Sequence, residues 1–423
     1  MAVTICFNDF KLNQLKIKLH LCLVCVKLLN IQTITMNIFL YFSSNTIRRA
    51  LFPLMSAGSL SLLSVSLLVG LNGCQGSAPV SGSSQRLLRL QSTAASPTPV
   101  PVPDFGQIPA PPENPVTQGK VELGFRLWFE PRLSANNRMT CATCHNHTMG
   151  FSNAQRNAAG VTGQRGERNV PTIYGSLWQR ETFWDGRAKS LEEQALGPIE
   201  NPIEMNESLP NVIKKLAQVP YYQQKFQAVF GSGPSAEGIA KAMASFERAL
   251  MMAPTPFERY QAGEKQALSP EQVRGMSLFF SGRTQCASCH QGPALSQGIF
   301  ANIGIGMNQP NPDLGRFVVT GMPWDKGSFK IPTLLNISRT APYMHDGSLP
   351  TLLAVIEHYD QGGIANPELD PRVRRLNLNP SEKNELLAFL NSLSAPDNLR
   401  SLGKLPGIHL PTAEVERLMS NQP

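Results

Sequence analysis

Clusters of basic residues are missing from this 423-residue sequence. It contains no run of Lys or Arg and no basic stretch interleaved with aromatic residues, so we expect no nucleic-acid partner. The formal net charge of +8 overstates the basic character of the folded part. Residues 1–73 carry six Lys or Arg against one Asp, a balance of +5, which leaves about +3 for the rest.

Long stretches of alternating apolar and polar residues are also scarce. From about Val116 to Ala395 the chain instead shows short segments with helical apolar spacing, separated by Gly, Pro and Asn. Alternation with period two is typical of half-buried strands, whereas apolar residues three and four apart are typical of amphipathic helices. The sequence therefore predicts an all-α fold with long loops.

Cysteine is rare as well, with eight residues in the whole chain. Four of them form two copies of one pattern, Cys141-Ala142-Thr143-Cys144-His145 and Cys286-Ala287-Ser288-Cys289-His290. Cys-x-x-Cys-His is the attachment pattern of c-type haem, because two thiols at this spacing form thioethers with one porphyrin while the next residue offers an imidazole to the iron. Two copies predict two covalent haem c groups with His145 and His290 as proximal ligands, and hence a redox protein outside the cytosol.

The sequence around Cys74 indicates a targeting segment over residues 1–73. Arg48 and Arg49 precede an apolar stretch, and Leu71-Asn72-Gly73-Cys74 resembles a bacterial lipobox. We expect Cys74 to carry a lipid anchor to the membrane. A cleaved signal peptide and an uncleaved membrane helix are the alternatives, because a spanning helix needs about twenty apolar residues and this stretch is nearly that long. Residues 1–35 are interpreted as an overextended start, with Met36 as the better initiator.

The rest of the chain divides into a tether, two related units and a tail. Residues 74–115 are rich in Ser, Ala and Pro, a composition that cannot bury a core and is typical of an extended linker. We expect an N-terminal cytochrome c-type domain over residues 116–265 and a C-terminal one over residues 266–403. A tail over residues 404–423 contains a predicted short helix from Thr412.

Each unit repeats one plan around its haem motif. Gly124-x-x-x-Trp128 precedes the first motif and Gly275-x-x-x-Phe279 precedes the second. A small residue with an aromatic one helical turn later suits a helix that crosses closely over another. Each unit also ends in an amphipathic helix, and the second opens with the capping box Asn379-Pro380-Ser381-Glu382. The apolar residues of these helices are Ile239, Met243, Phe246 and Leu250 in the first and Leu386, Phe389, Leu390 and Leu393 in the second. The arrangement favours two cytochrome c domains over two unrelated helical domains.

Several further motifs resemble the bacterial diheme cytochrome c peroxidases. They appear in the same order, over roughly residues 115–395, which is more specific than the haem motif alone. The resemblance implies one haem that reacts with peroxide and one that receives electrons. The motifs are Phe183-Trp184-Asp185-Gly186-Arg187-Ala188, Leu191-Glu192-Glu193-Gln194-Ala195, Asn201-Pro202-Ile203-Glu204-Met205, the stretch 329–336 and Thr340-Ala341-Pro342-Tyr343-Met344-His345-Asp346-Gly347.

Within that family the sequence is more similar to the MauG-type branch, the relatives of the methylamine-dehydrogenase maturation protein. In the standard peroxidases a histidine in the loop after the first haem motif blocks the peroxide-reacting iron until the enzyme is activated, but the loop Gly160–Gly166 has none. The spare His147, two residues past the proximal ligand, is interpreted as a surface or propionate contact. The standard peroxidases also use methionine as the distal ligand of the second haem, and the matching residue here is Tyr359.

Helical spacing also points to Tyr359 as that ligand. In a predicted helix from Leu352 to Asp360, Tyr359 shares one apolar stripe with Leu352, Val355 and Ile356, while His358 lies about a quarter-turn away. A phenolate would stabilise ferric iron. His358 remains a rival because imidazole is the commoner haem ligand, Met344 is a weaker one, and Tyr359 could simply belong to the core.

The resemblance implies a catalytic group at the first haem. Glu204 would act as the acid–base, with Gln194 as its hydrogen-bonding partner and Pro198 lining the pocket, since cleavage of peroxide needs a proton taken from one oxygen and returned to the other. Trp184 would relay electrons between the haems. The alternatives are a solvated surface carboxylate for Glu204 and a buried interface aromatic for Trp184.

The resemblance further implies a calcium site. Asn169 matches the family's side-chain ligand, and Thr340 and Pro342 would supply backbone carbonyls, which are the hard oxygen donors that Ca²⁺ prefers. Asn169 could equally be a turn residue.

These features lead to three functional hypotheses. The first is a periplasmic or otherwise extracytoplasmic diheme peroxidase that reduces hydrogen peroxide with electrons from a small redox protein, such as a cytochrome c or a cupredoxin. The second is a MauG-like enzyme that oxidises residues of a partner protein, and the third is a non-enzymatic diheme electron carrier. Family members are often homodimers, although no interface is legible in the sequence.

Overall fold

The computed structural model describes residues 108–250 and 254–395. They lie within the compact unit Thr93–Pro423, and the other unit, Met1–Ser92, lies outside the described residues. The expectations for the targeting segment, the lipid anchor at Cys74 and the helix from Thr412 therefore fall outside the described part of the chain. Ile108 and Asn114, at the end of the segment expected to be a tether, are buried. The packed chain thus extends at least to Ile108.

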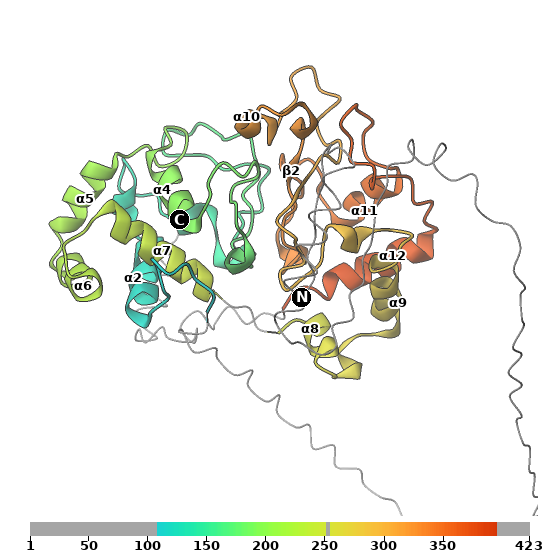
Figure 1. Ribbon diagram of the computed structural model, residues 1–423, viewed down its shortest axis with the longest axis horizontal. Helices are drawn as coiled ribbons and strands as arrows, with labels where there is room; N and C mark the ends of the chain where they lie inside the picture. Colours follow the sequence, from blue (N-terminus) through green and yellow to red (C-terminus); the bar gives the residue numbers. More distant parts are fainter. Residues whose placement is uncertain (1–107, 251–253, 396–423) are drawn as a thin grey trace, which may run out of the picture. The chain divides into compact units, whose positions relative to one another are not determined.

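Helices dominate the described residues, as the sequence predicts, and long loops connect them (Figure 1). The first half contains the helices α2 (Gln118–Trp128), α3 (Cys141–Cys144), α4 (Leu191–Glu200), α5 (Leu209–Ala217), α6 (Pro220–Phe230) and α7 (Ala236–Ala249). The second half contains α8 (Pro256–Gln261), α9 (Pro270–Phe279), α10 (Phe317–Thr320), α11 (Leu352–Asp360) and α12 (Pro380–Asn391). Two short antiparallel strands, β1 (Phe300–Ala301) and β2 (Phe329–Lys330), pair with each other.

Short 3₁₀ turns mark several of the loops. They are η4 (Pro131–Leu133), η5 (His147–Met149), η6 (Ser176–Trp178), η7 (Lys265–Ala267), η8 (Cys286–Ser288), η9 (Pro323–Asp325) and η10 (Ile337–Arg339).

The same helix crossing is built twice. In the first half α2 packs on α7, and in the second half α9 packs on α12 (Figure 1). A Cβ atom added at Gly124 would collide with the carbonyl oxygen of Ala242, and one added at Gly275 would collide with that of Glu385. Glycine at these two positions is what lets the backbones approach so closely. The close crossings predicted from the two Gly-x-x-x-aromatic patterns are confirmed.

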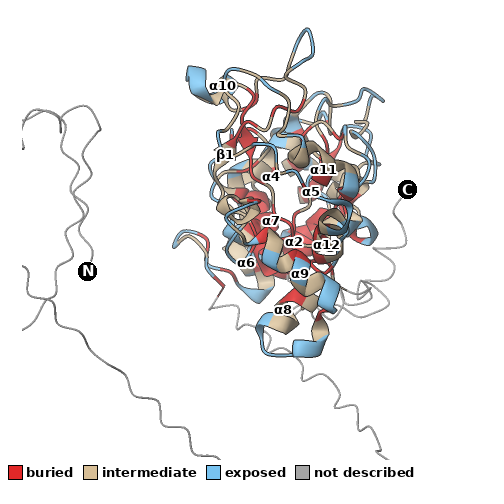
Figure 2. Ribbon diagram, turned by 90° about the vertical axis from the view of Figure 1, so that its right-hand side faces the viewer, coloured by how far each residue is buried: buried red, intermediate tan, exposed pale blue. Residues whose placement is uncertain are grey.

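Two hydrophobic clusters surround these crossings. One gathers buried side chains between Ile108 and Leu250 around α2 and α7, and the other gathers those between Phe257 and Leu393 around α9 and α12. Buried residues gather around α2, α7 and α12 (Figure 2), and α7 is buried over most of its length. The predicted capping box of α12 is present, with Asn379 and Glu382 bonding reciprocally and Pro380 at the first helical position.

Loops from the two halves are joined by hydrogen bonds and by ion pairs. The backbone N–H of Asn169 donates to the carbonyl oxygen of His345 at 2.7 Å, and that of Lys330 donates to the carbonyl oxygen of Trp184 at the same distance. The Arg168 guanidinium binds the carboxylate of Asp313 through two bonds of 2.7 and 2.9 Å. These contacts hold the loops that carry the candidate site residues.

Candidate haem site

The first Cys-x-x-Cys-His motif forms a single helical turn, α3, that begins after Thr140. The side chains of Thr140 and Thr143 form a capping box at its start. Burial raises the pKa of the Cys144 thiol to about 11 and that of Cys141 further. Nδ1 of His145 donates to the carbonyl oxygen of Phe151 at 3.0 Å. Because Nδ1 carries the proton, Nε2 keeps the lone pair that a metal requires.

The second motif repeats this arrangement. Cys286–Ser288 form the 3₁₀ turn η8, and Nδ1 of His290 donates to the carbonyl oxygen of Leu295 at 2.9 Å. Burial lowers the pKa of His290 to about 4, so its imidazole is neutral at physiological pH. None of the four motif thiols forms a disulfide. At both motifs, free thiols accompany a neutral imidazole that a hydrogen bond from Nδ1 holds in place. This arrangement fits covalent attachment of haem.

A cavity of about 410 Å³ contains both motifs on its walls. The structure brings nearly all of the site residues expected from the sequence to this one cavity. Cys141 is the exception, since it is not among the lining residues. The candidates that line the cavity are Cys144, His145, Asn169, Trp184, Gln194, Glu204, Cys286, Cys289, His290, Thr340, Pro342 and Tyr359.

Glu204 and Gln194 reach the cavity from α4 and the turn that follows it. Helix α4 starts after Ser190, whose side chain accepts from the N–H of Glu193. After the helix ends, Nδ2 of Asn201 donates to Oε1 of Glu204 at 2.8 Å. Burial raises the pKa of the Glu204 carboxyl, and the hydrogen bond from Asn201 partly offsets this effect. A half-buried carboxyl that faces a cavity and titrates closer to neutral pH suits proton transfer.

The loop Gly160–Gly166 supports Glu204. The backbone N–H of Val161 donates to the carbonyl oxygen of Glu204 at 2.8 Å, and a Cβ at Gly160 would collide with the carbonyl of Ile203. The loop that lacks a histidine therefore lies directly against the residue expected to act as the acid–base.

Trp184 lies where loops of the two halves meet. Its indole Nε1 donates to the carbonyl oxygen of Asn169 at 2.8 Å, and its own carbonyl oxygen accepts from Lys330 of β2. Both bonds fix the ring among residues of the cavity wall.

Tyr359 lies on the cavity, whereas His358 does not. The predicted helix Leu352–Asp360 is present with those bounds as α11, and Thr351 caps its start. Nε2 of His358 bonds to the carbonyl oxygen of Ile303 at 2.9 Å, so this nitrogen already has a partner. Burial raises the pKa of the Tyr359 phenol, and the thiols of Cys286 and Cys289 raise it further, which indicates that the phenol lies near the second motif. Met344 also lines the cavity.

Asn169, Thr340 and Pro342 all line the cavity. The amide Nδ2 of Asn169 donates to the carbonyl oxygens of Gln155 and Arg156 at 3.0 and 3.3 Å. The amide oxygen is thereby turned to the opposite side, where a hard cation could bind it. Among the described residues there is no group of three or more His, Cys, Asp or Glu that could hold a metal ion. A calcium site here would depend on amide and carbonyl oxygens.

His147 differs from its expected position. It is 5% exposed and does not line the cavity, so a surface role is wrong. The backbone pairing of Asn146 with Ser152 folds the segment that carries His147 back on itself.

Sequence reasoning missed two buried ionisable groups on the cavity wall, Glu247 of α7 and Lys330 of β2. Burial raises the pKa of Glu247 to about 8 and lowers that of Lys330 to about 8. The Lys330 ammonium bonds to the Gln179 amide oxygen rather than to a carboxylate. A haem propionate would supply the missing negative charge, which is a second sign that the cavity fits haem. Two features of the sequence could have pointed to these residues. Lys330 lies between the apolar residues Phe329 and Ile331, and Glu247 lies on the apolar face of a helix.

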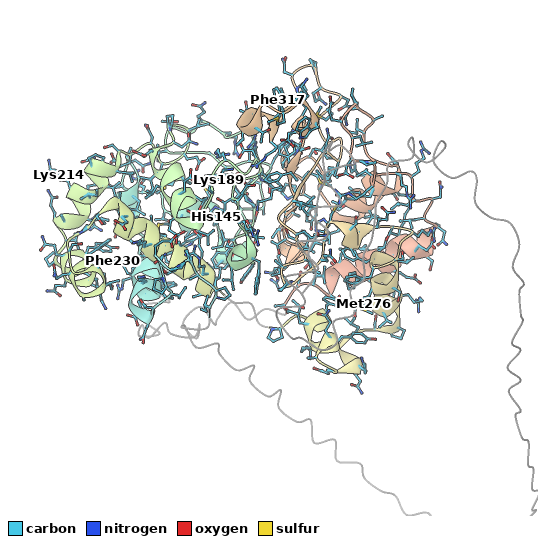
Figure 3. All side chains as sticks on the ribbon, viewed as in Figure 1. His145, Lys189, Lys214, Phe230, Met276 and Phe317 are labelled. Atoms are coloured by element: carbon cyan, nitrogen blue, oxygen red, sulfur yellow. The ribbon has the colours of Figure 1, made fainter. Side chains whose placement is uncertain are left out.

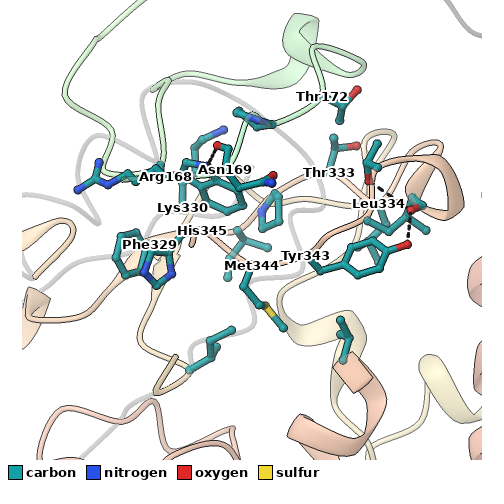
Figure 4. Close-up of a pocket in the computed structure, with 18 of the residues that line it drawn as sticks. Arg168, Asn169, Thr172, Phe329, Lys330, Thr333, Leu334, Tyr343, Met344 and His345 are labelled. Carbon is teal, nitrogen blue, oxygen red and sulfur yellow. Dashed lines mark hydrogen bonds between the residues drawn. The ribbon is translucent and has the colours of Figure 1, made fainter. Parts of the chain in front are cut away.

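Near Lys330 the wall carries a stacked pair of rings. Figure 4 shows the imidazole of His345 against the ring of Phe329, with centroids 3.5 Å apart and planes 11° from parallel. Burial lowers the pKa of His345 to about 4. Its imidazole is therefore a neutral part of the wall at physiological pH.

No helix within the described ranges 108–250 and 254–395 has the length and apolar character needed to cross a membrane.

Comparisons with known proteins place these features in one group. A family model described as "Di-haem cytochrome c peroxidase" matches residues 118–266. The "Methylamine utilization protein MauG" of Methylorubrum extorquens is 37% identical over 303 residues, which is 71% of this chain and 85% of that protein. The "Cytochrome c551 peroxidase" of Nitrosomonas europaea is 36% identical over 66% of this chain and 81% of that protein. Among solved structures, a MauG-like protein associated with microbial copper homeostasis is 30% identical, with a TM-score of 0.66 over 72% of this chain and 97% of that chain.

Proposed function

Since this chain belongs to the di-haem cytochrome c peroxidase family, in its MauG-type branch, we propose that it reduces hydrogen peroxide to water with electrons from an external redox protein. It is a peroxidase-type oxidoreductase by relationship. The proposal covers the reduction of peroxide, the external electron donor and the role of each site residue.

The observation that carries the proposal is the half-buried carboxyl of Glu204 on the wall of the cavity that contains the first haem motif. When bound through His145, the haem supplies an iron that can bind peroxide and deliver electrons to it. Glu204 takes a proton from one peroxide oxygen and returns it to the departing one. Asn201 holds Oε1, so Oε2 is the atom left to carry the proton. Gln194 provides a polar neighbour for the charge that develops.

The remaining cavity residues complete this assignment. Tyr359 would be the distal ligand of the second haem, opposite His290, and Trp184 would conduct electrons between the two groups. The bond from Trp184 to Asn169 would fix the indole for this role. Lys330 would neutralise a haem propionate.

Progress curves with reduced cytochrome c test the proposal. We expect peroxide reduction to begin without a lag in protein that has not been pre-reduced, because the loop Gly160–Gly166 contains no histidine to block the iron. A lag that disappears only after pre-reduction would count against this form of the proposal. No peroxide reduction with any small donor would reject it.

The similarity to Methylamine utilization protein MauG favours a second candidate, in which the stored oxidising equivalents modify residues of a partner protein. Stopped-flow spectroscopy separates the two. Fast turnover with reduced cytochrome c supports the first, and a state that keeps both equivalents for a long time supports the second. A resting spectrum in which both haems are low-spin would instead point to an electron carrier.

The setting of the enzyme is also part of the proposal. We propose a periplasmic or other extracytoplasmic location, with a lipid anchor at Cys74, a bound Ca²⁺ at Asn169, Thr340 and Pro342, and a cytochrome c or a cupredoxin as donor. The chemistry of c-type haem attachment supports the location. The enzyme would form a homodimer, as expected from the resemblance.

A further inference from the structure

Trp128 and Phe279 occupy equivalent places in the two halves of the molecule. Each lies four residues after the glycine of a helix crossing, Trp128 at the end of α2 and Phe279 at the end of α9. Trp128 packs against Phe246 with ring centroids 5.5 Å apart, and Phe279 packs against Phe389 at 5.2 Å. The interplanar angles, 55° and 56°, are nearly the same. The second half shows that phenylalanine is sufficient for this packing.

The tryptophan of the first half has a contact that packing alone does not require. Its ring lies against the proximal imidazole of His145, with centroids 5.7 Å apart. The side chain is 2% exposed, and its Nε1–H has no hydrogen-bond acceptor within reach among the described residues. An unpaired buried donor is unfavourable and calls for an explanation, of which a redox role is one.

We propose that Trp128 is a redox-active residue on the proximal side of the first haem, which gives up one electron during peroxide reduction. The inference rests on the proposed function. It adds a site for an oxidising equivalent beside the imidazole of His145, separate from the proposed route through Trp184. The residue at the equivalent place in the second half is Phe279, and its ring is much harder to oxidise than indole.

The electrons balance as follows. Hydrogen peroxide takes up two electrons and two protons and gives two water molecules. One electron leaves the indole of Trp128, and the other is drawn from the haem held by His145. Because no acceptor lies near Nε1, the oxidised indole keeps its proton and is a radical cation. Two electrons from the external donor then restore the resting protein, one at the indole and one at the haem held by His145.

Rapid freezing after addition of one equivalent of peroxide, followed by electron spin resonance, tests the proposal on the haem-loaded protein. We expect an organic radical whose spectrum narrows when the protein contains ring-deuterated tryptophan. The sequence has four tryptophans, so variants assign the signal. We expect Trp128→Phe to abolish it, and both Trp184→Phe and the exposed Trp178→Phe to retain it.

Phenylalanine fills the equivalent place in the native pair Phe279 and Phe389, so we expect Trp128→Phe to fold. An unchanged haem absorption spectrum would show that it does. Trp128→Tyr is the second variant, for which we expect a signal that responds to deuterated tyrosine instead of deuterated tryptophan. A radical that persists unchanged in Trp128→Phe would overturn the proposal, as would peroxide reduction without any tryptophan radical. In both cases the peroxidase function would stand. If the wild-type protein fails to reduce peroxide, the proposed function fails and this inference fails with it.

Discussion

The side-chain amide of Asn201 donates a 2.8 Å hydrogen bond to Oε1 of Glu204 at the wall of the cavity that contains the first haem motif. The bond orients a carboxyl that is half-buried, and it stabilises the ionised form against the effect of burial. In the proposed function, this pair would set both the position of the proton acceptor and the pH range in which its carboxylate is ionised.

Replacing Glu204 removes the proton carrier but not the volume of the side chain. We expect Glu204→Gln to lower kcat for peroxide reduction by about 10²–10⁴-fold, the usual contribution of a positioned general acid–base. Initial rates with reduced cytochrome c measure this, with Glu200→Gln, an exposed residue at the end of α4, as the matched control. Equal rates in the two variants would mean that Glu204 does not carry the proton.

The pH dependence follows from the raised pKa of Glu204. If the ionised carboxylate accepts the first proton, kcat/KM falls as the pH drops through a value above the ordinary glutamate pKa of about 4.3. Asn201→Ala removes a group that favours the ionised form, so we expect the acidic limb of the profile to move to higher pH. A limb that stays in place or moves to lower pH would contradict this assignment.

Much of the site could be predicted because its parts are local in the sequence. The two haem motifs, the helix Leu352–Asp360 and the capping box at Asn379 each follow from residues a few positions apart, and the structure contains all three. The stripe that contains Tyr359 and omits His358 follows from helical geometry alone.

The remaining features depend on residues that are far apart in the chain. The N–H of Asn169 reaches the carbonyl oxygen of His345, and Lys330 reaches Gln179, across long stretches of sequence. Periodicity carries no information on such contacts, and the burial of Glu247 and Lys330 is decided by what packs over them. For the same reason the sequence could not tell that His147 is enclosed rather than exposed.

Substitution of Tyr359 tests whether its phenolate is a ligand of the second haem. A phenolate stabilises ferric iron more than a thioether does, so we expect Tyr359→Met to raise the reduction potential of that haem. His358→Gln should leave the potential unchanged, because its Nε2 is bonded to Ile303 rather than directed to the cavity. Spectroelectrochemical titration of each variant measures both potentials. The opposite result, a shift with His358→Gln alone, would assign ligation to the imidazole.

Replacing Lys330 tests whether its positive charge lies close enough to a haem to affect the reduction potential. Its buried ammonium lies on the cavity wall without a carboxylate partner among the described residues. Removing this positive charge disfavours the reduced state, so we expect Lys330→Met to lower at least one haem reduction potential. Lys214→Met is the control, because Lys214 is exposed on α5, away from the labelled His145 in Figure 3. Identical potentials in both variants would show that Lys330 does not face a haem.

The proposed function requires that the iron held by His145 have an open coordination position that Glu204 can reach. Low-temperature electron spin resonance of the resting ferric protein measures this directly. We expect one high-spin haem, bound through His145 alone, and one low-spin haem, bound by His290 and Tyr359. A spectrum with two low-spin haems would contradict the account, because a protein ligand would then occupy the position that peroxide must take.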